Sequence, residues 1–162
     1  MTTPLPPASL ARRLAALGYD ALLLAALIFV TTGIVVPLYL HSGLPVAELN
    51  GVTKPPVWFS QGVLLPLLLL EIWAFYAWFW LHGGQTLGMK TWRIHVRRAD
   101  GSALTLLDTL KRFGAGLVTW ILLGAGYLLA LVPPSRQTLH DRLSGTVTLT
   151  LPKSGQKKKQ SR

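Results

Sequence analysis

An arginine and an aspartate stand seven residues apart where the first long apolar stretch begins, as Arg13 and Asp20. On a helix, seven residues are almost two turns, so both side chains project from one face with Cα atoms about 10 Å apart. An acid near the centre of a membrane span costs about 2.5 to 3.5 kcal/mol, so Asp20 should face protein groups or a hydrated crevice. Two interpretations stay open: a proton or cation site that Arg13 tunes, or a structural ion pair or capping contact that fastens this helix to its neighbours.

A second acid, Glu71, stands near the middle of the next apolar stretch, which contains no basic residue. It must therefore be protonated, paired across helices or hydrated. A titrating glutamate would suit proton-coupled transport. A neutral glutamate that hydrogen-bonds between helices is the alternative.

A glycine-rich segment follows this stretch and contains Gly84, Thr86, Gly88 and Lys90. It resembles a phosphate-binding loop in spacing, but Met89 separates the last glycine from the lysine. The segment also follows a membrane span, whereas a phosphate-binding loop follows a strand. We therefore expect a tight exit turn that places Lys90 at the lipid headgroups.

The pair His140-Asp141 has no further ligand at metal-binding spacing, so no metal site is expected. The chain has no cysteine, and its polar segments suggest no Ser-His-acid arrangement. The sequence thus predicts no enzyme and no cofactor.

The composition indicates a membrane protein. Of 162 residues, 51% are hydrophobic and 14% charged, with a net charge of +10 and a mean hydropathy of +0.43. Soluble domains carry about 25% charged residues. Abundant aliphatic residues exclude a disordered chain, and the lack of cysteine excludes a disulfide scaffold.

Three apolar segments cover residues 14–39, 58–81 and 113–132, and each reaches the roughly 20 residues that cross a bilayer. The first is too long for the core of a cleaved signal peptide and lacks a small-residue cleavage site. Aromatic rings at both ends of the second suit the headgroup level.

Two short segments, residues 92–96 and 145–151, alternate apolar and polar residues as strands do. The fold class expected is an all-α membrane protein, a small multi-pass helical bundle of about three apolar segments with short cytosolic strand elements. Its expected domains are a flexible N-terminal lead (residues 1–11), a membrane domain (12–151) and a basic tail (152–162).

Several of these pieces occur together in an order that resembles the RDD family of bacterial membrane proteins. The matching pieces are RLAALGYD at residues 13–20, GQTLGMK at 84–90, WRIHV at 92–96, DG at 100–101 and LHDRLSGT at 139–146. The resemblance covers residues 9–151. Their order and spacing carry the resemblance, because each motif alone is weak.

The family is named for one arginine and two aspartates, and the resemblance implies that these are Arg13, Asp20 and Asp141. Ser144 stands where many members have alanine, and Met89 where many have lysine. Glu71 belongs to no family motif. Further motif or structural positions are Gly84, Thr86, Gly88, Lys90, Arg112, His140, Gly145 and Thr146.

The resemblance implies transport of a small solute or cation, coupled to protons or sodium, across the bacterial cytoplasmic (inner) membrane. In this hypothesis Asp20 binds the proton or cation, Arg13 tunes it, and Asp141 completes a polar cluster. A pathway would then lie between protomers of a homo-oligomer. The rival hypothesis is a non-transporting membrane scaffold or partner-binding subunit. The expected lipid partners are anionic headgroups at the basic face, and nucleic acid is not expected.

The positive-inside rule and the length of the third apolar segment disagree on which side of the membrane the tail occupies. Residues 82–112 hold six basic residues, which places them in the cytoplasm. If residues 113–132 cross once, the seven basic residues after Pro133 lie outside, against the same rule. Glycines at 114, 116, 124 and 126 permit a segment that enters and returns. We favour a cytoplasmic tail.

Overall fold

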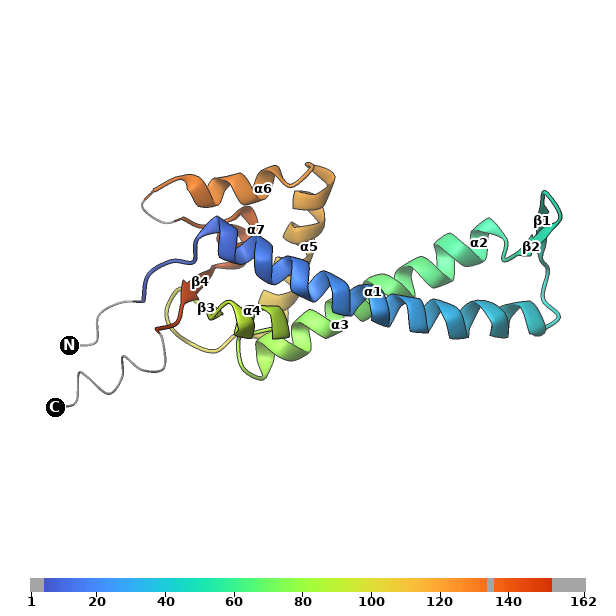
Figure 1. Ribbon diagram of the computed structural model, residues 1–162, viewed down its shortest axis with the longest axis horizontal. Helices are drawn as coiled ribbons and strands as arrows, with labels where there is room; N and C mark the ends of the chain where they lie inside the picture. The colour runs from blue at the N-terminus through green and yellow to red at the C-terminus, as the bar shows by residue number, and fades with distance from the viewer. Residues whose placement is uncertain (1–4, 134–135, 153–162) are drawn as a thin grey trace. The chain divides into compact units, whose positions relative to one another are not determined.

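The computed structural model describes residues 5–133 and 136–152 and is mostly helical (Figure 1). The chain forms two compact units. The sheet unit comprises the described residues up to Asp20 and from Tyr76 onward, and the hairpin unit is Ala21–Phe75.

Long apolar helices dominate the hairpin unit. Helix α1 (Leu10–His41) contains Pro37, and α3 (Leu65–Leu81) follows the single turn α2 (Val57–Phe59). A wider π-helical turn, Ser60–Leu64, lies just before Pro66. Proline cannot donate a backbone hydrogen bond and its ring clashes with the carbonyl four residues earlier, so a widened turn accommodates it.

Within the described residues, two helices are long and apolar enough to cross a membrane: Leu10–His41, with 32 residues, and Val57–Leu81, with 25. Their apolar side chains are largely exposed, as for Phe29 and Leu38. Such a surface suits hydrocarbon rather than water.

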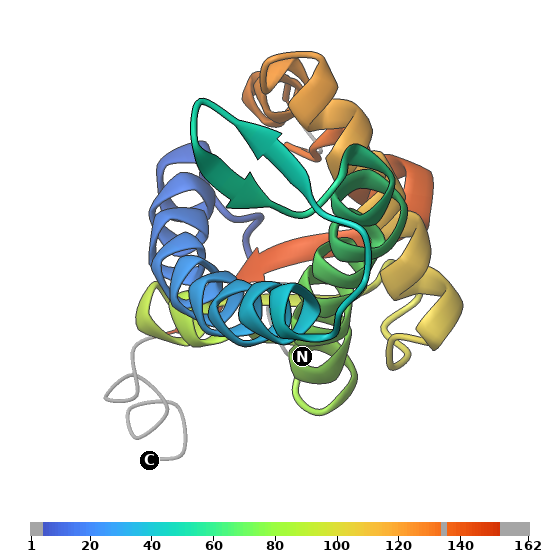
Figure 2. The same cartoon turned by 90° about the vertical axis from the view of Figure 1, so that its right-hand side faces the viewer.

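A short β-hairpin lies between these helices. It contains β1 (Ala47–Leu49) and β2 (Val52–Lys54), an antiparallel pair visible in Figure 2. Asn50 and Gly51 join the strands with φ values of 53° and 75°. Asn-Gly is the pair that tolerates this left-handed turn best.

The sheet unit is built on two antiparallel strands, β3 (Ile94–Arg98) and β4 (Thr146–Thr150). Their register runs from Ile94 opposite Thr150 to Arg98 opposite Thr146. The alternating patterns in the sequence therefore do mark strands. Helix α7 (Leu139–Ser144) precedes β4 and ends at Gly145, whose φ of 65° suits glycine. The unit's apolar core is Ala8, Ala16, Met89, Ile94, Val96 and Leu104, against which Trp80 packs.

The described part of the predicted N-terminal lead contacts β4 and enters α1. Pro7 bridges to Leu149, the Ala8 amide donates to the Thr148 carbonyl at 2.9 Å, and α1 begins at Leu10. This segment extends the β3–β4 sheet beyond β4. The predicted basic tail beyond Pro152 lies outside the described residues.

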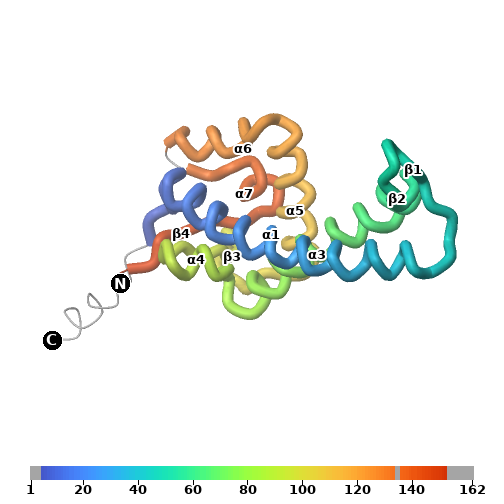
Figure 3. The backbone as a smooth tube through the Cα atoms, turned by 45° about the vertical axis from the view of Figure 1, so that its right-hand side comes forward, coloured from blue at the N-terminus to red at the C-terminus, as the bar shows by residue number. Residues whose placement is uncertain are grey.

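The third apolar segment is not one helix. Helix α5 (Leu106–Ile121) ends before a break at residues 122–124, and α6 (Ala125–Leu128) and the 3-10 turn Leu129–Leu131 follow at a bend of 110°. Figure 3 shows the chain turning back between α5 and α6. Leu123 and Gly124 have φ values of 50° and 83°, which stop the right-handed helix. About three apolar segments were expected to form the bundle, but only the first two are single helices of spanning length in the described chain.

Helix α5 buries most of its polar side chains, with Lys111 exposed. It begins with a capping box in which the Thr105 amide donates to Asp108 Oδ2 at 2.9 Å. Its buried face holds Asp108, Thr109, Arg112, Ala115 and Thr119, whereas Leu110, Trp120 and Ile121 are among its exposed side chains. A helix with a polar inner face and an apolar outer face is suited to contact lipid while lining a polar interior.

Short helix α4 (Leu87–Thr91) packs closely on α1 at Gly88, which is buried. A methyl group at Gly88 would overlap the Ala16 carbonyl oxygen and touch Asp20 Oδ1. By contrast, Gly18 has no atom within 4 Å of such a position. Close approach of the two backbones therefore requires glycine at residue 88.

Gly88→Ala should destabilise the protein by about 1 to 3 kcal/mol, because the added methyl forces α4 away from α1. Thermal unfolding in detergent measures the effect. The matched control Gly18→Ala should leave stability unchanged or raise it by up to about 1 kcal/mol through helix propensity. Equal midpoints for Gly88→Ala and wild type would contradict this packing.

Candidate functional site: a buried arginine–aspartate cluster

The Asp141 carboxylate is the centre of a buried polar cluster in the sheet unit. Asp141 is 0% exposed and lies in the first turn of α7. Its Oδ2 accepts from Arg13 Nη1 at 2.5 Å and from the Thr138 amide at 3.4 Å. Its Oδ1 accepts from Arg112 Nη1 at 2.7 Å and from Thr148 Oγ1 at 2.9 Å. Four donors thus saturate the carboxylate.

Arg13 reaches Asp141 from the first turns of α1 and is itself buried. Its Nε donates to the Ala8 carbonyl at 3.1 Å, and Nη2 donates to the Arg136 carbonyl at 3.2 Å. The planar guanidinium presents several donors in fixed directions, so one side chain joins segments far apart in sequence. Arg13 therefore connects α1 to the lead, to α7 and to the segment that precedes α7.

Arg112 completes the cluster from the buried face of α5. Besides Asp141, its Nη1 donates to the Thr146 hydroxyl, and its guanidinium lies 5.0 Å from the centre of the Trp80 ring. The indole face attracts a cation, which partly replaces the water that a buried guanidinium loses. Arg112 therefore ties α5 to α7, β4 and the end of α3.

Two guanidinium groups and one carboxylate leave the cluster with one net positive charge. Burial alone would raise the pKa of Asp141, but the guanidinium groups of Arg112 and Arg13 together hold that pKa well below its usual value. Asp141 is thus ionised throughout the physiological pH range. A carboxylate held in this way does not exchange protons there.

His140 is the neutral neighbour of the cluster. Burial, followed by the positive charge of Arg112, lowers the pKa of His140 to about 3. Its Nε2 lies 2.9 Å from Thr138 Oγ1, and its ring meets that of Tyr127 edge to face at 5.3 Å. His140 packs as an uncharged aromatic ring.

Asp20 has partners other than Arg13, and its contacts are those of the structural interpretation, in which it fastens the first helix to a neighbour, without an ion pair to Arg13. Asp20 Oδ2 accepts from Thr86 Oγ1 at 2.5 Å, and Oδ1 accepts from the Gly88 amide at 2.9 Å. Thr86 in turn caps α4, since its Oγ1 accepts from the Met89 amide at 3.2 Å. The spacing places Arg13 and Asp20 on one helix face, but each side chain is bonded to partners from other segments. Asp20 fastens α1 to α4.

Glu71 lies in the hairpin unit, where its Oε1 accepts from Thr31 Oγ1 at 2.5 Å. This contact links α3 to α1 and corresponds to the expected hydrogen bond between helices. The other oxygen, Oε2, is buried and has no hydrogen-bond partner among the described residues.

The other predicted positions have structural places. Gly84 has a φ of 65°, and a side chain there would meet His95 and the Val96 carbonyl. Lys90 is exposed in the last turn of α4. Gly145 ends α7, and Thr146 accepts from Arg112.

Sequence reasoning missed Thr138, Thr148 and Trp80 as members of the cluster. Thr138 stands three residues before Asp141, which is the capping-box spacing that signals a helix start. Thr148 is on the buried face of β4, where the alternating pattern places it with Thr146. Nothing in the spacing of Trp80 indicates its contact with Arg112.

Comparison with protein families decides which family these residues represent. The model of the RDD family matches residues 7–145, most of the chain. The chain belongs to the RDD family. Searches of curated proteins and of solved structures gave no match. In this RDD protein, Arg13 and Asp141 form a buried ion pair, and Asp20 accepts from the Gly88 amide of α4.

A double-mutant cycle distinguishes the two candidate partners of Arg13. Asp141→Asn should destabilise the protein by about 3 to 5 kcal/mol, because it leaves two buried guanidinium groups without a carboxylate. Arg13→Gln should cost less, about 1 to 3 kcal/mol, because Asp141 keeps its pair with Arg112 and loses only the contacts that Arg13 makes. The double variant should lose about 1 to 3 kcal/mol less stability than the sum of the losses in the two single variants. Unfolding in detergent gives these values. The matched cycle of Arg13→Gln with Asp20→Asn should be additive within about 0.5 kcal/mol, and the opposite pattern would restore the Arg13–Asp20 pair.

The depressed pKa of His140 predicts loss of stability in acid. Below pH about 6.5 the unfolded chain binds a proton at this histidine and the folded chain does not, so stability falls as the pH drops toward 3. At pH 5 this amounts to about 2 kcal/mol relative to pH 7. His95, whose pKa is also lowered by burial and by Arg97, acts in the same direction. Unfolding midpoints of His140→Gln should therefore depend less on pH than those of wild type, and equal slopes would contradict the assignment.

Proposed function

We propose that this RDD protein is a non-transporting membrane scaffold or partner-binding subunit in the bacterial cytoplasmic membrane. In it, the charged family residues lock the sheet unit into one fixed structure. The observation that carries the proposal is the saturation of Asp141 by four donors, two of them guanidinium groups. A group that carries protons or cations must exchange partners during each cycle, and breaking a buried ion pair costs several kcal/mol. We propose no catalytic role for these residues.

Asp20 supports the same role. Both of its oxygens accept hydrogen bonds from the segment that forms α4, and neither faces a described cation. A carboxylate with both oxygens engaged by a hydroxyl and a backbone amide is a helix clamp.

Transport is the second candidate, and Glu71 rather than Asp20 favours it. Glu71 is an acid in the middle of a candidate span, and its buried Oε2 lacks a hydrogen-bond partner among the described residues. Acids at such depth mark ion pathways in many membrane proteins. A pathway would need a second protomer, so this candidate includes a homo-oligomer.

The proposed topology has two spans followed by a segment that enters and returns. Strands β3 and β4 flank α5 and α6 in sequence and pair with one another, which requires both ends of the α5–α6 segment to lie on one side. Two spans with a returning segment put residues 82–112 and the tail on the same side. The positive-inside rule then places both in the cytoplasm, and the conflict between the two rules disappears.

Cation flux in proteoliposomes tests the scaffold role. Wild-type protein should give no proton or sodium flux above that of protein-free vesicles. Flux that Asp20→Asn abolishes would overturn the clamp assignment of Asp20. Flux that Glu71→Gln abolishes, while Asp20→Asn retains it, would select the transport candidate instead.

Cysteine labelling tests the topology, because the chain has no cysteine of its own. In spheroplasts, a membrane-impermeant thiol reagent should label Thr53→Cys, between the two spans, without lysis. Ser154→Cys, in the tail, should be labelled only after lysis. Rapid labelling of Ser154→Cys in intact spheroplasts would mean that the α5–α6 segment crosses the membrane.

A further inference from the structure

A pocket of about 380 Å³ lies in the sheet unit, and no residue of the Asp141 cluster is among its lining residues. It is bounded by the chain before α1, the start of α1, the residue before β3 and the end of β4. Two arginines, Arg12 and Arg93, line it together with Thr150, and Leu5 and Leu151 are among its apolar lining residues. Its volume falls within the range of small-molecule sites.

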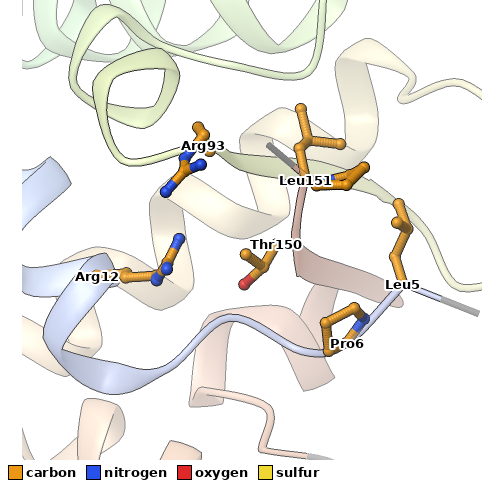
Figure 4. A pocket seen from close by; sticks show the side chains of 7 residues that line it. Leu5, Pro6, Arg12, Arg93, Thr150 and Leu151 are labelled. Carbon is orange, nitrogen blue, oxygen red and sulfur yellow. The ribbon is translucent and has the colours of Figure 1, made fainter. Parts of the chain in front are cut away.

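The polar groups of the pocket converge on one space. Figure 4 shows the guanidinium groups of Arg12 and Arg93 and the Thr150 side chain directed toward it. Arg12 donates to the Trp92 carbonyl at 3.2 Å, which positions its side chain. The Leu151 amide donates to the Arg93 carbonyl at 2.7 Å, which fixes the backbone at Arg93 to the end of β4.

Neither arginine has an acidic partner within the described residues. The ion pairs found there involve Arg13, Arg98 and Arg112, and no aspartate or glutamate lines the pocket. Two cations without an internal counter-ion favour an external anion. Guanidinium groups bind phosphate and carboxylate through paired N–H donors, and a hydroxyl adds a further donor.

The backbone at Arg93 gives independent support. Its φ is 53°, in the left-handed region that glycine adopts without strain. An arginine in this conformation has a backbone strain energy that glycine would avoid, and such strain is concentrated at functional sites. The conformation turns the chain between α4 and β3 and directs the Arg93 side chain into the pocket.

The pocket also lies where the apolar surface of α1 begins. Leu14, 47% exposed, is two residues beyond Arg12, which is about 3 Å along the helix axis. Trp92, whose carbonyl Arg12 contacts, is 41% exposed and suits the headgroup level. A ligand here would have its charged part on the arginines and its apolar part beside Leu5, Leu151 and the membrane.

The geometry points to a binding site for the phosphate of an anionic phospholipid headgroup, held by Arg12, Arg93 and the Thr150 hydroxyl. This site goes beyond the scaffold role and does not depend on it. It gives the sheet unit a specific lipid contact, in addition to the general attraction of basic residues for an anionic surface.

Binding of a fluorescent short-chain phosphatidylglycerol to the full chain in detergent tests the site. Arg12→Gln and Arg93→Gln should each weaken binding by about tenfold, since each removes one charge-assisted contact. Arg12→Lys should retain part of the affinity. The matched control Arg142→Gln removes an exposed arginine that does not line the pocket and should bind as wild type does.

Thermal unfolding without lipid confirms that each variant folds. Phosphatidylcholine, which has no net charge, should bind at least tenfold more weakly than phosphatidylglycerol. Inorganic phosphate that binds as tightly as the lipid would assign the site to a free phosphate and overturn the lipid assignment. Wild-type affinity in folded Arg12→Gln and Arg93→Gln, or an equal loss in Arg142→Gln, would overturn the site itself.

Discussion

The buried carboxylate of Asp141, held between two guanidinium groups, is the interaction on which the rest of the sheet unit depends. Arg13 brings α1 to it, Arg112 brings α5, and Thr148 brings β4. Because these partners come from separate parts of the chain, the cluster holds α1, α5, α7 and β4 together. Removing the carboxylate leaves both guanidinium groups buried without a counter-ion, which is strongly destabilising even where a buried pair adds little relative to an apolar core.

This constraint explains why α5 buries polar side chains and exposes apolar ones, the reverse of a helix in a soluble domain. Its buried face carries Arg112 and two threonines, and its exposed face is apolar apart from Lys111. In hydrocarbon, apolar side chains have no reason to face inward, while polar groups must find partners inside the protein. The same logic places Thr31 opposite Glu71 in the hairpin unit. Polar contacts specify how these helices pack.

Much of the fold could be predicted because its signals are local. Hydropathy predicted the two long helices, and alternation predicted β3 and β4. The break after Ile121 was signalled by glycines but not placed by them, since an uncharged segment of 20 residues is equally typical of a span. The partner of Arg13 could not be predicted from spacing. Asp141 is 128 residues away, and the start of α1 lies near it because the chain before α1 is hydrogen-bonded to β4, the strand that follows α7. The family resemblance supplied the three residues, but not which of them meet.

Asp141 stays ionised and fixes the packing of the elements around it. The chain has four aspartates, so carboxyl carbon signals of protein labelled with ¹³C-aspartate can be assigned by comparison with Asp141→Asn. In a pH titration by nuclear magnetic resonance, the Asp141 signal should stay at its ionised position from pH 8 to pH 4, since Arg112 and Arg13 lower its pKa against the opposing effect of burial. Uptake of a proton by Asp141 between pH 5 and 8 would contradict the account and make this residue a proton carrier.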